Sequence, residues 1–414
     1  MPTRRDFLAT SSLLGFGATV PAFLGRTAVA APNAAEPGAK DTVLVVVQLT
    51  GGNDGLNTVV PYADDGYGRL RTALRLPENS LKKVDDHIGL HPSLSGFAEL
   101  LEDGSLSIVQ GIGYPNPDES HFRSMDIWQA GSLAEQLTEG WLGKTLVHMP
   151  ASPAFHVAAT NEPSGLALAG APAKVPSISN LEQFQLQTLA ANSADRDRQR
   201  KFIAAGAKLD LKAGQVAGQS DLLSFVQQTA VNTFESSERL REIAKNYQPK
   251  SPYPATLLGE RLKLTAQLIE ADLGSRVFYV TLDGFDTHAG QLVVHANLLM
   301  ELSDAMTAFF KDMDARGHRD RILMMTFSEF GRRAKENLSA GTDHGSAAPM
   351  FLVGGRVKPG LIGDHPSLSD LLMDKLKHHT DFRQVYATIL DQWLEVPSAK
   401  ILGAEFKAID CLKA

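Results

Sequence analysis

The sequence predicts an α/β protein built on a doubly wound, mostly parallel sheet. Two observations support this fold class. Several short runs are continuously apolar and rich in Val, Leu, Ile and Phe, which is typical of strands that are covered on both faces. Amphipathic helical patterns lie between several of these runs, and such alternation indicates a doubly wound sheet.

The apolar runs define the predicted strands, and the helical patterns define the predicted covering helices. The strands are expected at residues 43–49, 106–113, 276–282, 321–327 and 349–355. The helices are expected at residues 93–104, 292–313 and 381–394. From about Leu181 to Asp272 the pattern changes to long polar-faced helices without a strand signal. We therefore expect one domain over residues 31–414 with a helical insertion at about 181–272.

The chain opens with a segment that resembles an export signal. Arg4 and Arg5 precede a mildly apolar run, and Ala28-Val29-Ala30 has the small-x-small pattern of a cleavage site. Paired arginines are typical of the twin-arginine route, so the twin-arginine export machinery is an expected partner. A retained membrane anchor is the alternative, but the run is interrupted by glycines and a proline and is shorter than the ~20 apolar residues of a spanning helix. We expect residues 1–30 to be removed, which leaves a periplasmic or secreted chain without an integral membrane segment.

Composition narrows the partners and the metal chemistry. The formal net charge is −7, and the loss of three basic residues and one acid with residues 1–30 makes it −9. This charge argues against nucleic acid or an anionic membrane as a partner. Cys411 is the single cysteine, which excludes an internal disulfide and metal sites built from several cysteines. Any metal is expected to be held by His, Asp and Glu.

Polar side chains follow the predicted strands directly, where open α/β sheets bind their ligands. After the first strand come paired glycines and then Asn53 and Asp54. Gly, Asn and Asp are the commonest turn formers, so a plain turn explains this segment when it is taken alone. A ligand role for Asp54 is the functional alternative.

The segment DGFDTH follows the third predicted strand and contains Asp283, Asp286 and His288. Oxygen and nitrogen ligands on one short loop form a half-site for a hard cation or zinc. A cap on the following helix is the structural alternative, and it explains one aspartate but not all three residues.

The segment SEFGRR follows the fourth predicted strand. Glu329 is suited to bind metal or to position an arginine, and Arg332 and Arg333 are suited to clamp the oxyanion of a phosphate or sulfate group. A surface salt-bridge cluster is the alternative, and it explains Arg333 as well as the functional interpretation does.

Adjacent Asp343 and His344 lie between glycines in GTDHG, just before the fifth predicted strand. Adjacent acid and imidazole side chains can reach neighbouring metals, or the carboxylate can orient the imidazole. The flanking glycines allow close approach to a ligand.

These motifs together resemble the secreted bacterial family called domain of unknown function 1501. The resemblance rests on LVVVQLTGGNDGLNTVVPY, SHFRSMDIWQAG, LDGFDTH, TFSEFGR and GTDHGSAAPMFLVGG. That family is similar to the alkaline-phosphatase-like superfamily, whose relatives include sulfatases, phosphodiesterases and cofactor-independent phosphoglycerate mutases. The resemblance implies a three-layer α/β/α sandwich, a divalent metal such as zinc, calcium or manganese, and a Ser, Thr or modified Cys nucleophile.

The resemblance also implies a set of metal ligands. They are Asp54 (or Asn53), Asp283, Asp286, His288, Asp343 and His344. The pair Asp343-His344 matches the superfamily pattern well. The expected Asp-x-x-x-His spacing is absent, because Asp283 lies five residues and Asp286 two residues before His288. A late histidine has only His365 and His379 as candidates, so one metal and two metals both stay open.

The segment NPDESHFRSMDIWQAG resembles the superfamily segment that carries the nucleophile at the start of a helix. Ser120 would lie in the first turn, where the helix dipole favours an anionic oxygen and a bound phosphate. Ser124 lies one turn further on, and His121 is suited to act as a base or as a ligand. A capping serine is an equally good interpretation of Ser120.

Two functions follow from this sequence. The first is an exported metal-dependent hydrolase of small-molecule or polymeric phosphate or sulfate esters, with Ser120 as nucleophile and Arg332 holding the anion. The second is a catalytically silent binding or structural protein that keeps the alkaline-phosphatase-like fold. The absent late histidine and the unresolved nucleophile favour the second function. Metal content and the turnover of an aryl phosphate and an aryl sulfate distinguish the two.

Overall fold

The computed structural model describes residues 41–413, except 150–151, 153, 159–164, 173–174 and 182–238. The signal peptide expected over residues 1–30 lies outside the described residues. So does most of the helical insertion expected at about 181–272. The part of the insertion that is described begins with a helical segment at residues 239–246.

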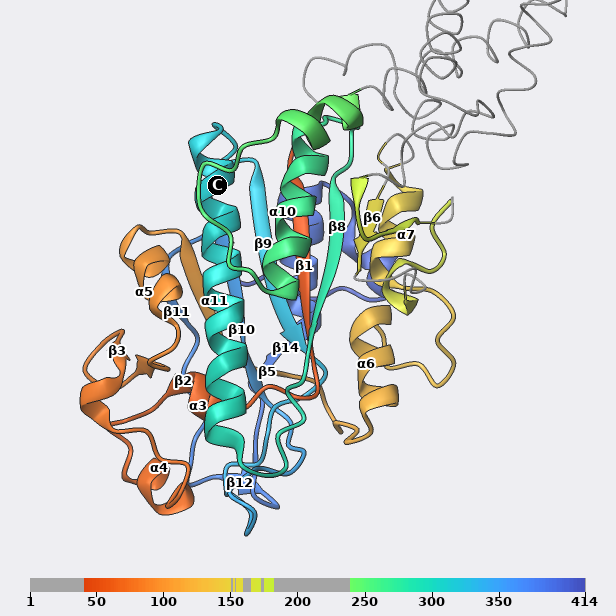
Figure 1. Ribbon diagram of the computed structural model, residues 1–414. Coiled ribbons are helices and arrows are strands. Elements are labelled where there is room, and N and C mark those ends of the chain that lie inside the picture. Colours follow the sequence, from red (N-terminus) through yellow and green to blue (C-terminus); the bar gives the residue numbers. More distant parts are fainter. Residues whose placement is uncertain are drawn as a thin grey trace, which may run out of the picture.

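The described residues form a nine-stranded sheet in which all strands except β10 run in one direction (Figure 1). In spatial order the strands are β11 (Gly360–Ile362), β5 (Leu106–Gly113), β10 (Ala348–Gly354), β9 (Ile322–Ser328), β1 (Val43–Thr50), β8 (Val277–Asp283), β6 (Ala154–Val157) and β7 (Ser177–Ile178), and β14 (Thr380–Asp381) also pairs with β5. Strand β10 is antiparallel to both of its neighbours. The expected doubly wound, mostly parallel sheet is confirmed, and all five predicted strands are present.

Helices cover both faces of the sheet, which explains why the strand sequences are apolar without alternation. One face carries α5 (Ser95–Glu102), α10 (Leu257–Glu270) and α11 (Gln291–Ala315), and the other carries α6 (His121–Ala130), α7 (Trp141–Val147), α12 (Phe382–Thr388) and α13 (Ser398–Leu402). Successive residues of β1 alternate between the two cores: Val45 packs on the α11 side and Val46 on the α6 side. Figure 1 shows α10 and α11 in front of the sheet. The three-layer architecture is thereby confirmed.

Local sequence signals set where these helices begin. The Thr256 side chain accepts a hydrogen bond from the Gly259 N–H at the start of α10. Asp381 and Gln384 form a reciprocal capping box at the start of α12, which satisfies two backbone N–H groups that have no partner within the helix. The remaining helical segments are α3 (Gly55–Thr58), α4 (Asp65–Leu70), the 3-10 turns η1 (Glu78–Ser80) and η2 (Leu166–Leu168), and the π-helical η4 (Ile389–Leu394).

The chain returns from the insertion by packing against the far end of α11. Asp312 is buried there and accepts hydrogen bonds from the Tyr253 hydroxyl (3.0 Å) and the Lys250 N–H (2.8 Å), and also from the Tyr247 hydroxyl. A buried carboxylate needs such partners. The described part of the insertion is therefore joined to the main core. Within the described residues, no helix has the length and apolar character needed to cross a membrane.

The polar segments after the strands meet at one edge because the central strands end level with one another. Thr50 pairs with Asp283, and Leu49 pairs with Ser328. The same edge carries α3, α4 and small strands, and Figure 1 shows it at the lower end of the molecule. The small strands are β2 (Val59–Val60), β3 (Lys82–Lys83), β4 (Gly89–Leu90), β12 (Leu371–Leu372) and β13 (Lys375–Leu376).

Candidate metal centre

Two glycines after β1 allow three loops to pack together at this edge. Gly51 and Gly52 have φ values of +118° and +81°, which side chains rarely allow. A Cβ at Gly51 would lie 2.4 Å from the Asp286 backbone nitrogen, and a Cβ at Gly52 would lie 2.4 Å from the Phe330 ring. Glycine is thus required at both positions because neighbouring loops pack directly against the backbone there, and not only because the chain turns.

Three imidazoles and one carboxylate converge where these loops meet. Asp286 Oδ1 lies 3.0 Å from His288 Nε2 and 3.3 Å from His344 Nε2. Asp286 Oδ2 lies 3.5 Å from His121 Nε2, and the Nε2 atoms of His288 and His344 are 2.9 Å apart. Four ligands about 2.0 Å from a tetrahedral metal lie roughly 3.3 Å from one another. His121, Asp286 and His344 each offer a ligand atom within 4.8 Å of the other two, which is the scale of a metal ligand set, and His288 adjoins them through Asp286 and His344.

Each of the three imidazoles presents Nδ1 to an oxygen acceptor. The pairs are His121 Nδ1 with Glu329 Oε1 (2.8 Å), His344 Nδ1 with the Glu119 carbonyl (2.8 Å), and His288 Nδ1 with Asp343 Oδ1 (3.4 Å). With each Nδ1–H donating outward, the lone pairs of the Nε2 atoms face Asp286. Nε2 atoms at these separations need a shared proton or a cation between them, and Arg332 Nη1 lies 3.4 Å from His288 Nε2 on one side. The nitrogen and carboxylate donors present are of the kinds that hold a divalent metal ion.

Glu329 supports this set from behind. It is fully buried, and Oε1 accepts a hydrogen bond from the Gly51 N–H (2.8 Å) as well as from His121. Its carboxylate thus ties the loop after β1 to the first residue of α6. The sequence suited Glu329 to bind metal or to position an arginine, and in the structure its carboxylate instead contacts the His121 ring and the Gly51 N–H.

Asp54 does not join the set. It is buried and forms a two-pronged ion pair with Arg71, with distances of 2.5 and 2.8 Å, and Gln291 donates to it as well. Burial raises the pKa of the Asp54 carboxyl, but the charge and hydrogen bonds of Arg71 outweigh this and hold it below its usual value. The alternative, Asn53, is engaged with His295 Nε2 at 2.9 Å. The predicted ligand role at this position therefore does not fit.

Two other predicted ligands also lie outside the set. Asp283 is exposed at the end of β8 and, among the described residues, makes none of the contacts of the cluster. Asp343 accepts a hydrogen bond from Asn337 Nδ2 (3.1 Å), which lowers the pKa of its carboxyl, and its Oδ1 faces His288 Nδ1. Asp343 thus contacts His288 from outside the cluster, and His121, which the sequence left open as a base or a ligand, lies inside it.

Arg332 holds the loops together and is not exposed to a substrate. It is 1% exposed, and its guanidinium donates to the Gly52 and Thr342 carbonyls (2.8 Å each) and to Asp286 Oδ1 (2.5 Å). Burial raises the pKa of the Asp286 carboxyl, but its bond with Arg332 outweighs burial and lowers it below its usual value. The predicted role of Arg332 as an anion clamp does not fit this environment.

The two candidate nucleophiles differ in environment. Ser120 is the exposed N-cap residue of α6, and its hydroxyl makes no capping hydrogen bond, so the capping interpretation is not supported. Ser124 is buried, donates to the Glu329 carbonyl (2.5 Å) and lies 2.7 Å from the Tyr114 hydroxyl. Of the two candidates, Ser120 is the accessible one, and it directly precedes His121 in the chain.

Two cations lie beside the cluster and share one carboxylate. Glu119 forms an ion pair with Lys375 and a second one, at 3.6 Å, with Arg333. The Glu119 carbonyl also contacts His344. Arg333 is 35% exposed, so it is open to solvent where Arg332 is not.

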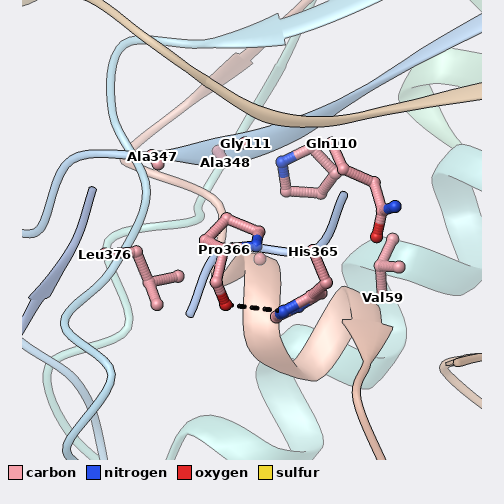
Figure 2. A pocket seen from close by; sticks show the side chains of 10 residues that line it. Val59, Gln110, Gly111, Ala347, Ala348, His365, Pro366 and Leu376 are labelled. Carbon is pink, nitrogen blue, oxygen red and sulfur yellow. Dashed lines mark hydrogen bonds between the residues drawn. The ribbon is translucent and has the colours of Figure 1, made fainter. Parts of the chain in front are cut away.

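The candidates for the late histidine do not reach the cluster. His365 Nδ1 donates to the Pro366 carbonyl (2.9 Å), and His379 Nε2 lies 2.6 Å from the Asp364 carbonyl. His365 lines a separate pocket, which Figure 2 shows. Within the described residues, the donors gathered at the cluster are enough to hold one metal ion.

Comparison with solved structures finds likeness in overall fold. The lipoteichoic acid synthase LtaP from Listeria monocytogenes is 9% identical, with a TM-score of 0.37 over 93% of this chain and 79% of that one. A protein of the alkaline phosphatase superfamily from Vibrio parahaemolyticus is 8% identical, with a TM-score of 0.36 over 93% and 75%. The PsFucS1 sulfatase from Pseudoalteromonas sp. is 11% identical, with a TM-score of 0.36 over 99% and 78%.

Comparison by sequence assigns the family. No curated protein matches this chain. The model of a protein family of unknown function, DUF1501, matches residues 41–400, which span the sheet and every residue of the cluster. The chain therefore belongs to the DUF1501 family.

Proposed function

We propose that this chain is an exported, metal-dependent hydrolase of phosphate or sulfate esters. The observation that carries the proposal is the convergence of three Nε2 atoms and the Asp286 carboxylate at the carboxyl edge of the sheet, with each ring held by an oxygen at Nδ1. Nitrogen-rich sets of this kind favour zinc over calcium, which prefers oxygen ligands. The expected ion is therefore zinc, bound by His121, Asp286, His288 and His344.

A divalent metal bound there would polarise the ester oxygen and stabilise negative charge. The chain supplies the other groups. Ser120 lies at the N-terminus of α6, next to the ligand His121. The helix dipole favours negative charge at this end, both on an ionised serine oxygen and on the bound ester. Ser120 is the nucleophile in this proposal.

The anionic group of the substrate needs a positive partner, and Arg333, whose side chain is 35% exposed, is better placed for it than the buried Arg332. The Nε of Arg333 donates to the His344 carbonyl (3.3 Å). Lys375 is buried but shares the Glu119 carboxylate with Arg333. An incoming phosphate or sulfate would replace the Glu119 carboxylate between Arg333 and Lys375. Export through the twin-arginine route belongs to the same proposal and rests on residues 1–30 of the sequence.

A catalytically silent binding protein is the second candidate. It is favoured by one observation: Asp54 and Arg332, two residues expected to act in the site, are taken up by internal ion pairs. In that case the cluster would stabilise the fold or bind a partner without turnover.

The decisive experiment measures metal content and turnover together. The exported chain is purified without chelators, assayed for bound zinc, and tested with an aryl phosphate and an aryl sulfate. His344→Ala should lose both metal and turnover, whereas His87→Ala, at an exposed position, should keep both. Bound zinc without turnover on either ester supports the silent protein, and absence of any metal contradicts both the site and its proposed chemistry.

A further inference from the structure

A second site lies at the same edge of the sheet, between the end of β5 and the start of β10 (Figure 2). It is a pocket with an empty volume of about 250 Å³ up to its open mouth. Most of its wall is small or apolar: Gly55, Val59, Gly111, Ala347, Ala348, Pro349, Pro366 and Leu376. The polar side chains in the wall are Gln110 and His365. The space in it that a water-sized group can enter is small, roughly enough for one hydroxyl or water, and the rest of the volume is open to solvent.

Gln110 presents an oxygen that has no partner. The residue is 3% exposed, and its Nε2 donates to the Gly363 carbonyl at 2.7 Å. This bond fixes the orientation of the amide, because a flipped amide would set two oxygens against each other. Oε1 is left without a hydrogen bond among the described residues. Figure 2 shows it turned toward the side of the pocket where Val59 and His365 lie.

A buried acceptor without a partner is costly, so the pocket is built for a donor. A buried water molecule usually makes about three hydrogen bonds. Of the unpartnered buried side-chain atoms in the described residues, Gln110 Oε1 alone belongs to this pocket. A lone water would be held by one bond against an apolar wall. A donor that is attached to carbon fits better, because its stem gains from the apolar contacts.

The charge of the residues around the pocket indicates which class of hydrogen-bond donor it can bind. Among the described residues no Asp or Glu lines it, and burial lowers the pKa of the His365 imidazole. An ammonium group would therefore lie in an apolar pocket without a counter-charge. An uncharged O–H donor meets no such penalty.

We propose that this pocket binds an uncharged aliphatic hydroxyl group, which donates to Gln110 Oε1 while its carbon stem packs on Pro349 and Pro366. The pocket and the metal centre share two loops: Gly55 follows the segment after β1, and Ala347 lies three residues after His344. The assignment of this pocket as a substrate subsite rests on the proposed hydrolase function. The hydroxyl then belongs to the alcohol part of a hydroxylated ester. Binding of the hydroxyl group itself does not depend on that function.

The experiment uses propane-1,2-diol as the probe and saturation-transfer NMR on the purified full chain, with and without zinc. Two variants test the site independently: Gln110→Met removes the acceptor, and Ala348→Leu fills the space without touching Gln110. The control Gln136→Met makes the same change at an exposed position. Propylammonium, which has no hydroxyl group, is the matched cationic probe.

We expect the diol to bind the unaltered chain and the control equally, with and without zinc, and to bind each pocket variant at least about tenfold more weakly. Propylammonium should give no signal. If one of the two pocket variants fails to fold, the other still tests whether the diol binds in this pocket. Absence of diol binding in the unaltered chain, or equal binding after Ala348→Leu, overturns the inference and leaves a pocket for water only. If the diol binds but the chain takes up no metal and turns over no ester, the proposed hydrolase function is contradicted, and the hydroxyl-binding pocket remains supported.

Discussion

The carboxylate of Glu329 lies 2.8 Å from Nδ1 of His121, although the two residues are 208 positions apart in the chain. Glu329 is fully buried at the end of β9, and His121 is the first residue of α6. Because the carboxylate accepts the Nδ1–H, it fixes the tautomer that directs Nε2 toward Asp286. This contact joins the sheet to the helix that carries the proposed nucleophile.

Replacement of Glu329 should weaken metal binding without removing a ligand. In Glu329→Gln the side chain keeps its shape but loses the charge that makes the imidazole a stronger donor. We expect zinc affinity to fall by about 10- to 100-fold, as for other residues that orient metal-binding histidines. A chelator competition titration measures this effect, with the exposed Glu405→Gln as control. Unchanged affinity in a folded Glu329→Gln protein would show that His121 is not a ligand.

The fold could be predicted from sequence because burial on two faces leaves a direct mark. Val45 and Val46 face opposite cores, so both must be apolar, and the run of valines reports this. The direction of β10 could not be predicted, because a buried parallel strand and a buried antiparallel strand have the same continuous apolar pattern. The pattern fixed which segments are strands, and the pairing of β10 with β5 and β9 depends on long-range packing.

The site was predictable where its residues lie close to the end or the start of a predicted strand. Asp286 and His288 follow β8, His344 lies in a glycine-flanked Asp-His pair just before β10, and all three lie in the cluster. His121 begins a helix just after Asp118 and Glu119, and the sequence left its role open between a base and a ligand. Its partner Glu329 is far away in sequence, so only the fold shows that Nε2 faces Asp286. Asp54 was predicted as a ligand because it follows the first strand. Nothing in the sequence indicated its ion pair with Arg71, because Arg71 belongs to no motif.

Stability should fall below pH 6.5 because of two buried imidazoles. Burial lowers the pKa of both His91 and His295 to about 4, whereas an unfolded histidine has a pKa of about 6.5. Between pH 4 and pH 6.5 the unfolded chain binds more protons than the folded chain. The contribution of each neutral histidine to the free energy of unfolding is therefore complete above pH 6.5 and is lost as the pH falls toward 4. We expect about 2 kcal/mol less stability per histidine at pH 5 than at pH 7.

Urea unfolding of the chelator-treated chain at both pH values measures this loss. His295→Gln keeps a donor for Asn53 and should remove roughly half of the pH-dependent difference, while the exposed His148→Gln should leave it unchanged. An equal pH response in His295→Gln and the unaltered chain would contradict the assignment.

Glu119 should compete with anions for Arg333 and Lys375. In Glu119→Gln the two cations lose their shared counter-charge, so inorganic phosphate should inhibit aryl-ester turnover at several-fold lower concentration. Lys375→Met should have the opposite effect. Asp410→Asn removes the acid from a different lysine pair, at the surface with Lys358, and serves as the control. Weaker inhibition of Glu119→Gln would mean that Glu119 only stabilises the loop.

Ser120 should be needed for turnover but not for metal binding. Its hydroxyl is exposed at the start of α6 and is not used in capping, so Ser120→Ala removes the proposed nucleophile at little cost to the helix. We expect full zinc content and a drop in turnover of at least about a thousandfold, with Ser95→Ala as the control at another exposed helix start. Intact-mass measurement after rapid acid quenching should detect one phosphoryl group on the unaltered chain and none on Ser120→Ala. If Ser120→Ala retains turnover while His344→Ala loses it, the attacking group is not this serine, and the role of α6 is reduced to holding His121 and the anion.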